Sequence, residues 1–211
     1  MLDGGLRARI YDTAILPLTT AWYAAVLERL PEGAALLDVG IGTGGALAAN
    51  AETLRRKRIR VTGIDIDPDY IARCRRSIDD SGLEDLVEAR LESVYDHEGG
   101  PYDAVYFSAS FMLLPDPRGA LDHVRALLAP EGRLYFTQTF ENRRSPLMER
   151  LKPMLRTLTT IDFGRVTYEE DFREELRTAD VELIEMARLG GNRARSYHIA
   201  VARPGDAPAP S

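Results

Sequence analysis

The sequence at residues 38–45 reads Asp38-Val39-Gly40-Ile41-Gly42-Thr43-Gly44-Gly45. It continues the apolar run AALLDV at 34–39, which is typical of a buried strand, and it precedes a segment whose apolar residues have helical spacing. Glycines at such a junction permit a tight turn and let a ligand approach the bare backbone. Because the strand ends in acidic Asp38, the loop favours a cationic group over a pyrophosphate. The stretch predicts a strand, a ligand-binding loop and a helix in succession.

Strand-like and helix-like segments alternate after this loop. Runs rich in β-branched or aromatic residues occur at 60–65, 103–108 and 133–139, and VEARL at 87–91 is a further strand candidate. Apolar residues between them recur on one helical face, in the sets Leu47, Ala51 and Leu54; Ile71, Cys74 and Ile78; and Leu121, Val124 and Leu128. Asp67-Pro68 and Asp116-Pro117 each offer an N-cap followed by proline at the first helical position. This alternation predicts an α/β fold, with a mostly parallel sheet and helices on both faces.

Both ends of the chain depart from this alternation. Residues 1–30, which include the stretch from Tyr11 to Tyr23, are expected to form an N-terminal helical cover before the first strand. Strand-like runs at 181–187 and 196–202 lie close together and predict a hairpin. We expect the main domain at 31–203, a lid insert at 141–165 and a disordered tail at 204–211.

The glycine loop has an alternative interpretation. Gly40, Gly42 and Gly45 also satisfy G-x-G-x-x-G, the pattern of dinucleotide-binding loops. An NAD(P)-dependent oxidoreductase is therefore the alternative to weigh. Asp38 counts against it, because its carboxylate stands where a pyrophosphate would need neutral or positive surroundings.

The segment LLDVGIGTG resembles the first motif of the class I S-adenosylmethionine (SAM) dependent methyltransferases, a strand ending in Asp or Glu before x-G-x-G-x-G. Asp65 in VTGIDIDP matches the acidic residue that ends the family's next strand. The resemblance covers residues 30–203. It implies a seven-stranded sheet in the order 3-2-1-4-5-7-6 with strand seven antiparallel, and the predicted hairpin suits this order.

The resemblance also implies a cofactor site. In the family, the residue at Asp65 bonds to both ribose hydroxyls, the one at Ile66 lies against adenine, and a polar residue near the end of strand three meets the adenine edge. Glu92 and Ser93 are the candidates for that edge, although the usual residue is Asp. Ser108 is a candidate for contact with SAM, or caps the following turn. The full predicted cofactor set is Asp38, Gly40, Gly42, Thr43, Gly44, Asp65, Ile66, Glu92, Ser93 and Ser108.

Residues that contact the methyl acceptor are expected just after strands four and five. Phe111 and Met112 are candidates for an apolar acceptor pocket, with plain core packing as the alternative. The polar candidates for a catalytic role are Gln138, Glu141 and Tyr11. Arg143 and Arg144 are candidates for binding an anionic acceptor, with a solvated lid face as the alternative. No Asn/Asp-Pro-Pro-aromatic sequence follows strand four, which disfavours methyltransferases of exocyclic amines.

Composition narrows the class of partner. The chain has 211 residues and a net charge of −6, which disfavours nucleic acid. With one cysteine, Cys74, it can form no internal disulfide or cysteine-rich metal cluster, and we expect no metal site. Its first residues lack the apolar run of a signal or membrane span, so we expect a cytoplasmic protein. The sequence predicts a SAM-dependent methyltransferase with a small-molecule acceptor; a SAM-binding regulatory protein without catalysis remains the alternative, and the oligomeric state stays open.

Overall fold

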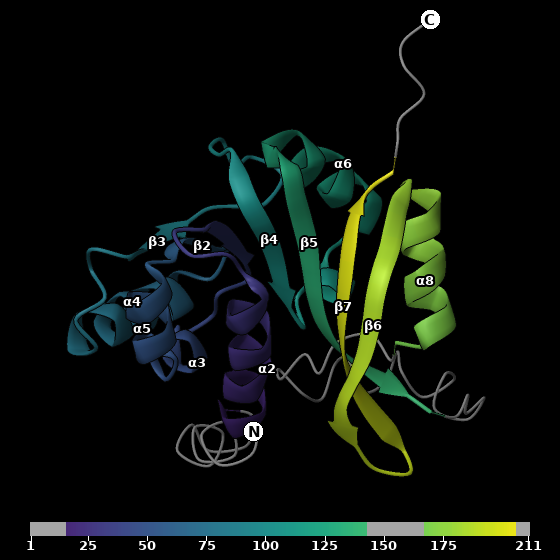
Figure 1. Cartoon of the computed structure of the whole chain (residues 1–211), viewed down its shortest axis with the longest axis horizontal. Coiled ribbons are helices and arrows are strands. Elements are labelled where there is room, and N and C mark those ends of the chain that lie inside the picture. Colours follow the sequence, from purple (N-terminus) through teal and green to yellow (C-terminus); the bar gives the residue numbers. More distant parts are fainter. Residues whose placement is uncertain (1–15, 143–166, 206–211) are drawn as a thin grey trace, which may run out of the picture.

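A single sheet in the order β3-β2-β1-β4-β5-β7-β6 organises the computed structural model, which describes residues 16–142 and 167–205 (Figure 1). Its strands are β1 (Ala35–Val39), β2 (Arg60–Asp65), β3 (Val87–Leu91), β4 (Tyr102–Ser108), β5 (Leu128–Glu141), β6 (Val181–Gly191) and β7 (Arg195–Pro204). The first five strands pair in parallel, whereas β7 runs antiparallel to both β5 and β6. The predicted fold class and strand order are confirmed.

Helices cover both faces of this sheet. The described helices are α2 (Leu16–Arg29), α3 (Gly45–Ala48), α4 (Ala51–Lys57), α5 (Pro68–Asp80), the short 3₁₀ helix η2 (Phe111–Leu113), α6 (Pro117–Leu127) and α8 (Glu169–Thr178). Apolar side chains of α2 to α5 pack into one core, and those of η2, α6 and α8 pack into a second core on the opposite face. The strands therefore lie between two buried layers of side chains. Figure 1 shows where α2 and α8 lie along the sheet.

One predicted helix is divided. The apolar stripe from Leu47 to Leu54 predicted a single helix, but the structure has α3 and α4 separated at Asn50. The Asn50 amide donates to the carbonyl oxygens of Ala46 at 2.8 Å and Thr20 at 3.1 Å. A short polar side chain that bonds to nearby backbone competes with the helical pattern, which explains the break.

The predicted N-caps of α5 and α6 are confirmed. The Asp67 carboxylate accepts from the backbone N–H of Asp69 at 2.8 Å and of Tyr70 at 3.2 Å. Asp116 accepts from the N–H of Gly119 at 2.9 Å. Such caps typically contribute about 1 kcal/mol, because they satisfy donors that the first helical turn leaves unpaired. They fix where each helix begins after the carboxyl ends of β2 and β4.

Aromatic side chains hold α8 and η2 against the sheet. Phe136 of β5 stacks on Phe107 of β4 with ring centroids 5.2 Å apart. Its ring also meets Phe111 at 5.1 Å and Phe172 of α8 at 5.3 Å, both edge-on. Such pairs prefer edge-to-face or offset stacking, and each adds about 0.5–1.5 kcal/mol beyond buried area. This cluster fixes one side of the region just beyond β4 and β5.

Some predicted boundaries shift. β5 begins at Leu128, which pairs with Tyr102, so the strand is longer than the apolar run at 133–139 indicated. β7 includes Pro204, and the N–H of Gly205 donates to the Asp180 carbonyl at 2.8 Å, so the predicted tail does not begin at 204. The rest of that tail (206–211), residues 1–15 of the N-terminal cover and residues 143–165 of the lid insert lie outside the described residues. The domain boundaries at 30 and 31 stay predictions.

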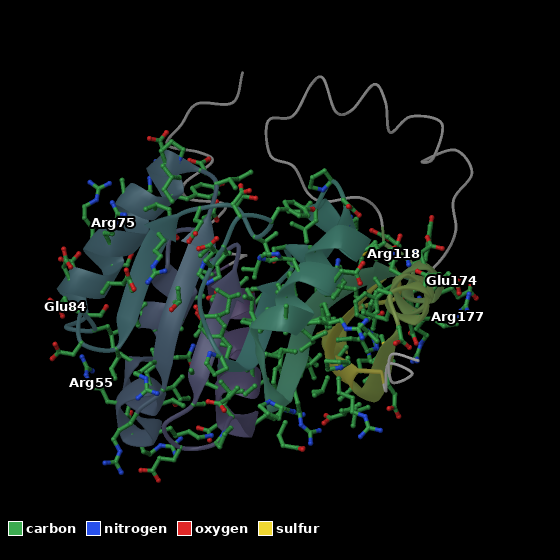
Figure 2. All side chains as sticks on the ribbon, turned by 90° about the horizontal axis from the view of Figure 1, so that it is seen from above. Arg55, Arg75, Glu84, Arg118, Glu174 and Arg177 are labelled. Carbon is green, nitrogen blue, oxygen red and sulfur yellow. The ribbon has the colours of Figure 1, made fainter. Side chains whose placement is uncertain are left out.

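Charged side chains project outward from the helices, among them Arg118, Glu174 and Arg177 (Figure 2). Arg177 pairs with Glu174 at 2.6 Å on the exposed face of α8. Within the described ranges, the helices are too short or too polar to cross a membrane.

Candidate cofactor site

The glycine loop between β1 and α3 adopts left-handed backbone angles at alternate residues. Gly40, Gly42 and Gly44 have φ values of 81°, 62° and 69°, a region that strains L residues carrying a side chain. A Cβ on Gly40 would lie 2.7 Å from Ser110 Cβ, and one on Gly44 would lie 2.7 Å from Cys74 Sγ. A Cβ on Gly42 would meet nothing within 4 Å. Gly40 and Gly44 therefore allow Ser110 and Cys74 to pack closely against the loop, while Gly42 leaves one side of the backbone open to a ligand.

Asp65 ties this loop to the next strand. Its Oδ2 accepts from the Gly42 N–H at 3.0 Å, and its Oδ1 accepts from the Asp67 N–H at 2.9 Å. A carboxylate has about four acceptor sites, so both oxygens keep capacity for further donors such as hydroxyl groups. Asp65 thus shapes the loop and remains able to bind a ligand.

Asp38 lies fully buried at the end of β1. Its Oδ2 accepts from the Tyr23 hydroxyl of α2 at 2.6 Å, whereas its Oδ1 has no hydrogen-bond partner in the part of the chain that the structure describes. Burial raises the Asp38 pKa to about 7; the Tyr23 hydrogen bond opposes this rise, and the neighbouring Asp65 charge adds to it. An acidic oxygen without a partner, beside a loop open at Gly42, fits a ligand with a cationic group.

Exposed apolar side chains follow β2 and end β3. Ile66 is 76% exposed, and Leu91, which pairs with Asp65, is 53% exposed. Exposed aliphatic side chains at adjacent strand ends suit the face of a planar aromatic ligand. Ile66 is thus accessible to a ligand, and its contact with adenine stays a prediction.

Glu92 and Ser93 follow β3 but already have local partners. Glu92 Oε2 lies 2.8 Å from Nδ1 of His97, whose ring is fully buried and whose Nε2 lies 2.9 Å from the Tyr102 hydroxyl. Ser93 Oγ accepts from the Tyr95 N–H at 3.3 Å, which caps the turn. Both residues keep some exposed surface, so either side chain can still meet a ligand edge.

The remaining cofactor candidates lie near the loop. The Thr43 carbonyl accepts from the Ser77 hydroxyl at 2.9 Å. Ser108 ends β4 and pairs with Thr137, whose hydroxyl lies 2.8 Å from that of Tyr106. The structure therefore brings the loop, Asp65 and the end of β4 to one edge of the sheet.

The residues predicted to bind the acceptor or to act in catalysis differ in their burial and contacts. Phe111 has no exposed surface and Met112 is mostly buried, so in this structure both belong to the second core. Gln138 is buried, and its amide lies 3.4 Å from the Thr167 hydroxyl. Glu141 accepts from Arg195 Nε at 2.6 Å. The other three candidates, Tyr11, Arg143 and Arg144, lie outside the described residues.

Comparison with known proteins matches this architecture. Residues 37–134 match a family profile described as a methyltransferase domain. The ubiquinone biosynthesis O-methyltransferase of Erwinia tasmaniensis is 33% identical over 135 residues, which cover 64% of this chain and 54% of that protein. A phosphatidylethanolamine N-methyltransferase of Cereibacter sphaeroides is 28% identical over 161 residues, 74% of each chain. The structure of a geranyl diphosphate methyltransferase in complex with SAM superposes with a TM-score of 0.69 at 16% identity, covering 96% of this chain and 91% of that one.

The chain therefore has the fold of SAM-dependent methyltransferases, and its residues 37–134 match a methyltransferase domain. These matches support SAM as the predicted cofactor, whereas none of the matches named above supports the NAD(P)-dependent alternative. The chain spans about half the length of the ubiquinone biosynthesis relatives, 54% for the protein of Erwinia tasmaniensis and 44% for that of Xylella fastidiosa.

Two residues of the candidate cofactor site were not predicted from the sequence. Tyr23 was expected only within a helical cover, yet it is the hydrogen-bond partner of Asp38. His97 was not among the predicted site residues, yet its ring is fully buried and lies against Glu92. A tyrosine among the apolar residues of α2 was the available signal for Tyr23, because a buried hydroxyl needs a partner.

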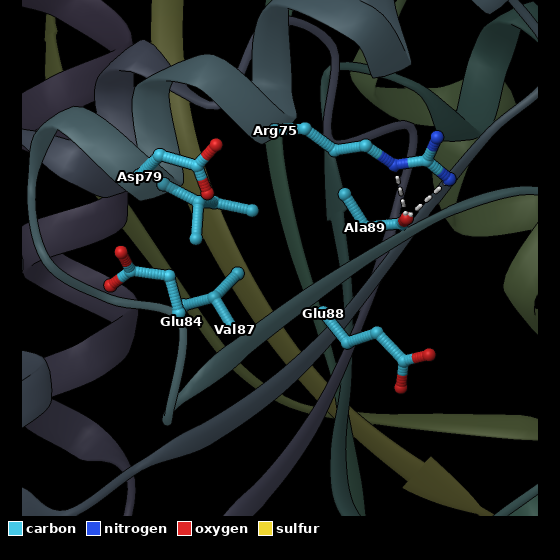
Figure 3. Close-up of a pocket in the computed structure, with 7 residues that line it drawn as sticks. Arg75, Asp79, Glu84, Val87, Glu88 and Ala89 are labelled. Carbon is cyan, nitrogen blue, oxygen red and sulfur yellow. Dashed lines mark hydrogen bonds between the residues drawn. The ribbon is translucent and has the colours of Figure 1, made fainter.

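A hollow of about 330 Å³ lies elsewhere on the molecule, between α5 and the edge strand β3 (Figure 3). Arg75 spans it and donates to the Ala89 carbonyl at 3.2 and 3.1 Å. Asp79, Glu84 and Glu88 also line it. It lies beside the first residues of β3, whereas the glycine loop follows the carboxyl end of β1, so it is separate from the cofactor site.

Proposed function

We propose that this protein transfers the methyl group of SAM to a heteroatom or carbon of a small-molecule acceptor. The observation that carries the proposal is the buried Asp38 oxygen, which has no partner among the described residues and lies directly before the glycine loop. In that loop Gly42 donates its N–H to Asp65 and has open space on the side where a Cβ would be. The relatives named as O- and N-methyltransferases support the same reaction class.

The chain's own residues would hold SAM in distinct ways. In this proposal Asp38 receives the ammonium group, and Asp65 accepts from the two ribose hydroxyls with the acceptor sites it has left. Ile66 covers one face of the adenine, and Glu92 meets its edge. The open backbone at Gly42 admits the ligand at close range.

SAM supplies an electrophilic methyl carbon on a positively charged sulfur. In the proposed step the acceptor atom bonds to that carbon, the carbon–sulfur bond breaks, and its electron pair stays on sulfur to give S-adenosylhomocysteine (SAH). Any proton on the acceptor passes to a neighbouring base or to water. The protein then acts mainly by alignment and exclusion of water, which supplies roughly 7–11 kcal/mol in well-oriented reactions.

Two of the residues proposed for catalysis have restricted roles in this structure. The Gln138 side chain is an amide, so it can orient an acceptor but cannot take its proton. Glu141 carries a carboxylate, and its ion pair with Arg195 holds it in place and must rearrange before it acts as a base. An anionic acceptor bound by Arg143 or Arg144 remains the finer proposal, and it rests on the sequence.

Two measurements test the function. Calorimetry with SAH and with NAD and NADP should show micromolar binding of SAH alone. Incubation of the protein with a metabolite extract and SAM labelled in the methyl group should then yield a labelled small molecule, identified by mass. SAH binding without labelled product would favour the regulatory alternative, and nicotinamide binding without SAH binding would overturn the cofactor assignment.

The anionic acceptor has its own test once the product is known. Arg143→Met and Arg144→Met keep length and remove charge, and Arg118→Met on the exposed face of α6 is the control. A buried charge-assisted contact should make one of the first two variants lose at least tenfold in kcat/KM, whereas a solvated arginine contributes little. If all three variants match the parent, the acceptor is not held by these arginines.

A further inference from the structure

The buried pair of Tyr23 and Asp38 connects α2 to the strand that enters the glycine loop. The Tyr23 hydroxyl donates to Asp38 Oδ2 at 2.6 Å, and both residues are almost wholly buried. The ring of Tyr23 packs edge-on against Tyr106 with centroids 5.1 Å apart, so the direction of the hydroxyl is fixed by packing. One oxygen of Asp38 is thus bound, and the other is left without a partner among the described residues.

We propose that Tyr23 is a positioning residue for the cofactor, which holds Asp38 so that its other oxygen receives the ammonium group and which couples cofactor binding to release of a proton from Asp38. The inference rests on the proposed function, because it requires SAM or SAH at the loop. It goes further because it gives α2 a role in cofactor binding and states that a proton is released when the cofactor binds.

Four titratable groups face Asp38 from the surrounding elements: Tyr23 of α2, Cys74 of α5, Tyr106 of β4 and Asp65 of β2. Burial raises the pKa of the Cys74 thiol to about 12 and raises the pKa of both tyrosines above their usual value. These three groups therefore keep their protons near neutral pH. Asp65 contributes a like charge, which favours a protonated Asp38.

The direction of the pH effect follows from this arrangement. Below about pH 7 the free protein carries a proton on Asp38, which must leave before the carboxylate can pair with a cation. SAH affinity should therefore rise about tenfold for each pH unit up to about pH 7 and level off above it. Because the Tyr23 hydrogen bond lowers the Asp38 pKa, removing the hydroxyl should move this curve to higher pH.

Calorimetry with SAH from about pH 6 to about pH 8.5 tests the inference on three proteins: the parent, Tyr23→Phe and the control Tyr135→Phe. Tyr135 is buried on the same face of the sheet, in β5, and its ring is not among the groups facing Asp38. We expect Tyr23→Phe to bind at least threefold more weakly than the parent at pH 7, with the difference shrinking at higher pH. Tyr135→Phe should follow the parent curve. Parallel curves for the parent and Tyr23→Phe would show that Tyr23 only packs.

Proton release gives a second readout that needs no change at Tyr23. Titrations of the parent in two buffers with different ionisation enthalpies should report about one proton released per SAH at pH 6 and close to none at pH 8. Asp38→Asn keeps an acceptor for the Tyr23 hydroxyl but cannot titrate, so it should bind SAH more weakly and release no proton. Binding by the parent without proton release at pH 6 would overturn the inference alone, whereas no SAH binding at any pH would overturn the proposed function and this inference with it.

Discussion

At the scale of single residues, Asp65 combines a structural contact with a binding role. Its oxygens accept from the backbone of Gly42 and Asp67, and the proposed ribose contacts would use the acceptor sites that remain. Charge-assisted hydrogen bonds are worth about 1.5–3 kcal/mol each. Asp65→Ala should therefore weaken SAH binding at least tenfold in calorimetry.

The structural contact requires a control. Asp79→Ala removes an exposed carboxylate from α5, away from the loop, and should leave SAH binding unchanged. Circular dichroism must show that Asp65→Ala still folds, since the loop loses a tie to β2. If the folded variant binds SAH as tightly as the parent, the ribose lies elsewhere.

Sequence reasoning at this scale found acidic residues more readily than their partners. Asp38 and Asp65 stand at strand ends next to a glycine pattern, and local spacing is enough to single them out. Tyr23 and His97 depend on contacts with β1 and with Glu92 and Tyr102, which only the tertiary structure creates. Phe111 is a case in which sequence position suggested a binding role that the structure does not support. Its position after β4 suggested an acceptor pocket, but three aromatic rings from β4, β5 and α8 pack against it in the core.

At the scale of elements, the glycine loop offers a matched pair of substitutions. Gly42 and Gly33 both have positive φ, 62° and 77°, and a Cβ at either residue would meet nothing within 4 Å. Alanine at each should cost a similar stability, about 1–2 kcal/mol of backbone strain. Only Gly42→Ala places a methyl group where the cofactor is proposed to approach.

We therefore expect both variants to unfold at similar denaturant concentrations, but only Gly42→Ala to lose SAH affinity, by tenfold or more. Chemical denaturation and calorimetry measure the two quantities separately. Equal SAH affinity in the two variants would mean that the ligand does not approach the loop at Gly42.

Local chemistry explains which elements could be predicted. The caps at Asp67 and Asp116 act on the next turn of chain, so their signals are complete within a few residues. The start of β5 depends instead on its pairing with Tyr102, and the break at Asn50 depends on a bond to Thr20 of α2. Boundaries set by a distant partner leave no periodic pattern in their own segment.

At the scale of the whole molecule, the buried Asp38 links stability to pH. Its pKa is raised from 3.8 to about 7, so between those values the folded protein binds more protons than the unfolded chain. Stability from Asp38 is then complete below about pH 4 and is lost as pH rises to about 7. Carboxylates such as Glu88, whose pKa is lowered, act in the opposite sense.

The difference between the parent and Asp38→Asn isolates this contribution. Without ligand, the melting temperature of the parent should fall relative to that of Asp38→Asn as pH rises from about 4 to about 7, and the gap should stay constant above that. Scanning calorimetry across this range measures it. A gap independent of pH would mean that Asp38 is ionised throughout.

The position of β7 also constrains how the chain assembles. β7 follows every other described strand in sequence, yet it lies between β5 and β6. β6 can therefore join the sheet only through its hairpin partner, and β7 must close a long loop to reach β5. Contacts of such sequence separation form late, because loop-closure entropy is lost before pairing compensates for it. In pulse-labelled hydrogen exchange during refolding, the amides that pair β1 with β2, such as those at Ala35 and Arg60, should gain protection before those that pair β7 with β5, such as those at Glu141 and Arg195. The hairpin would then dock onto strands that have already paired.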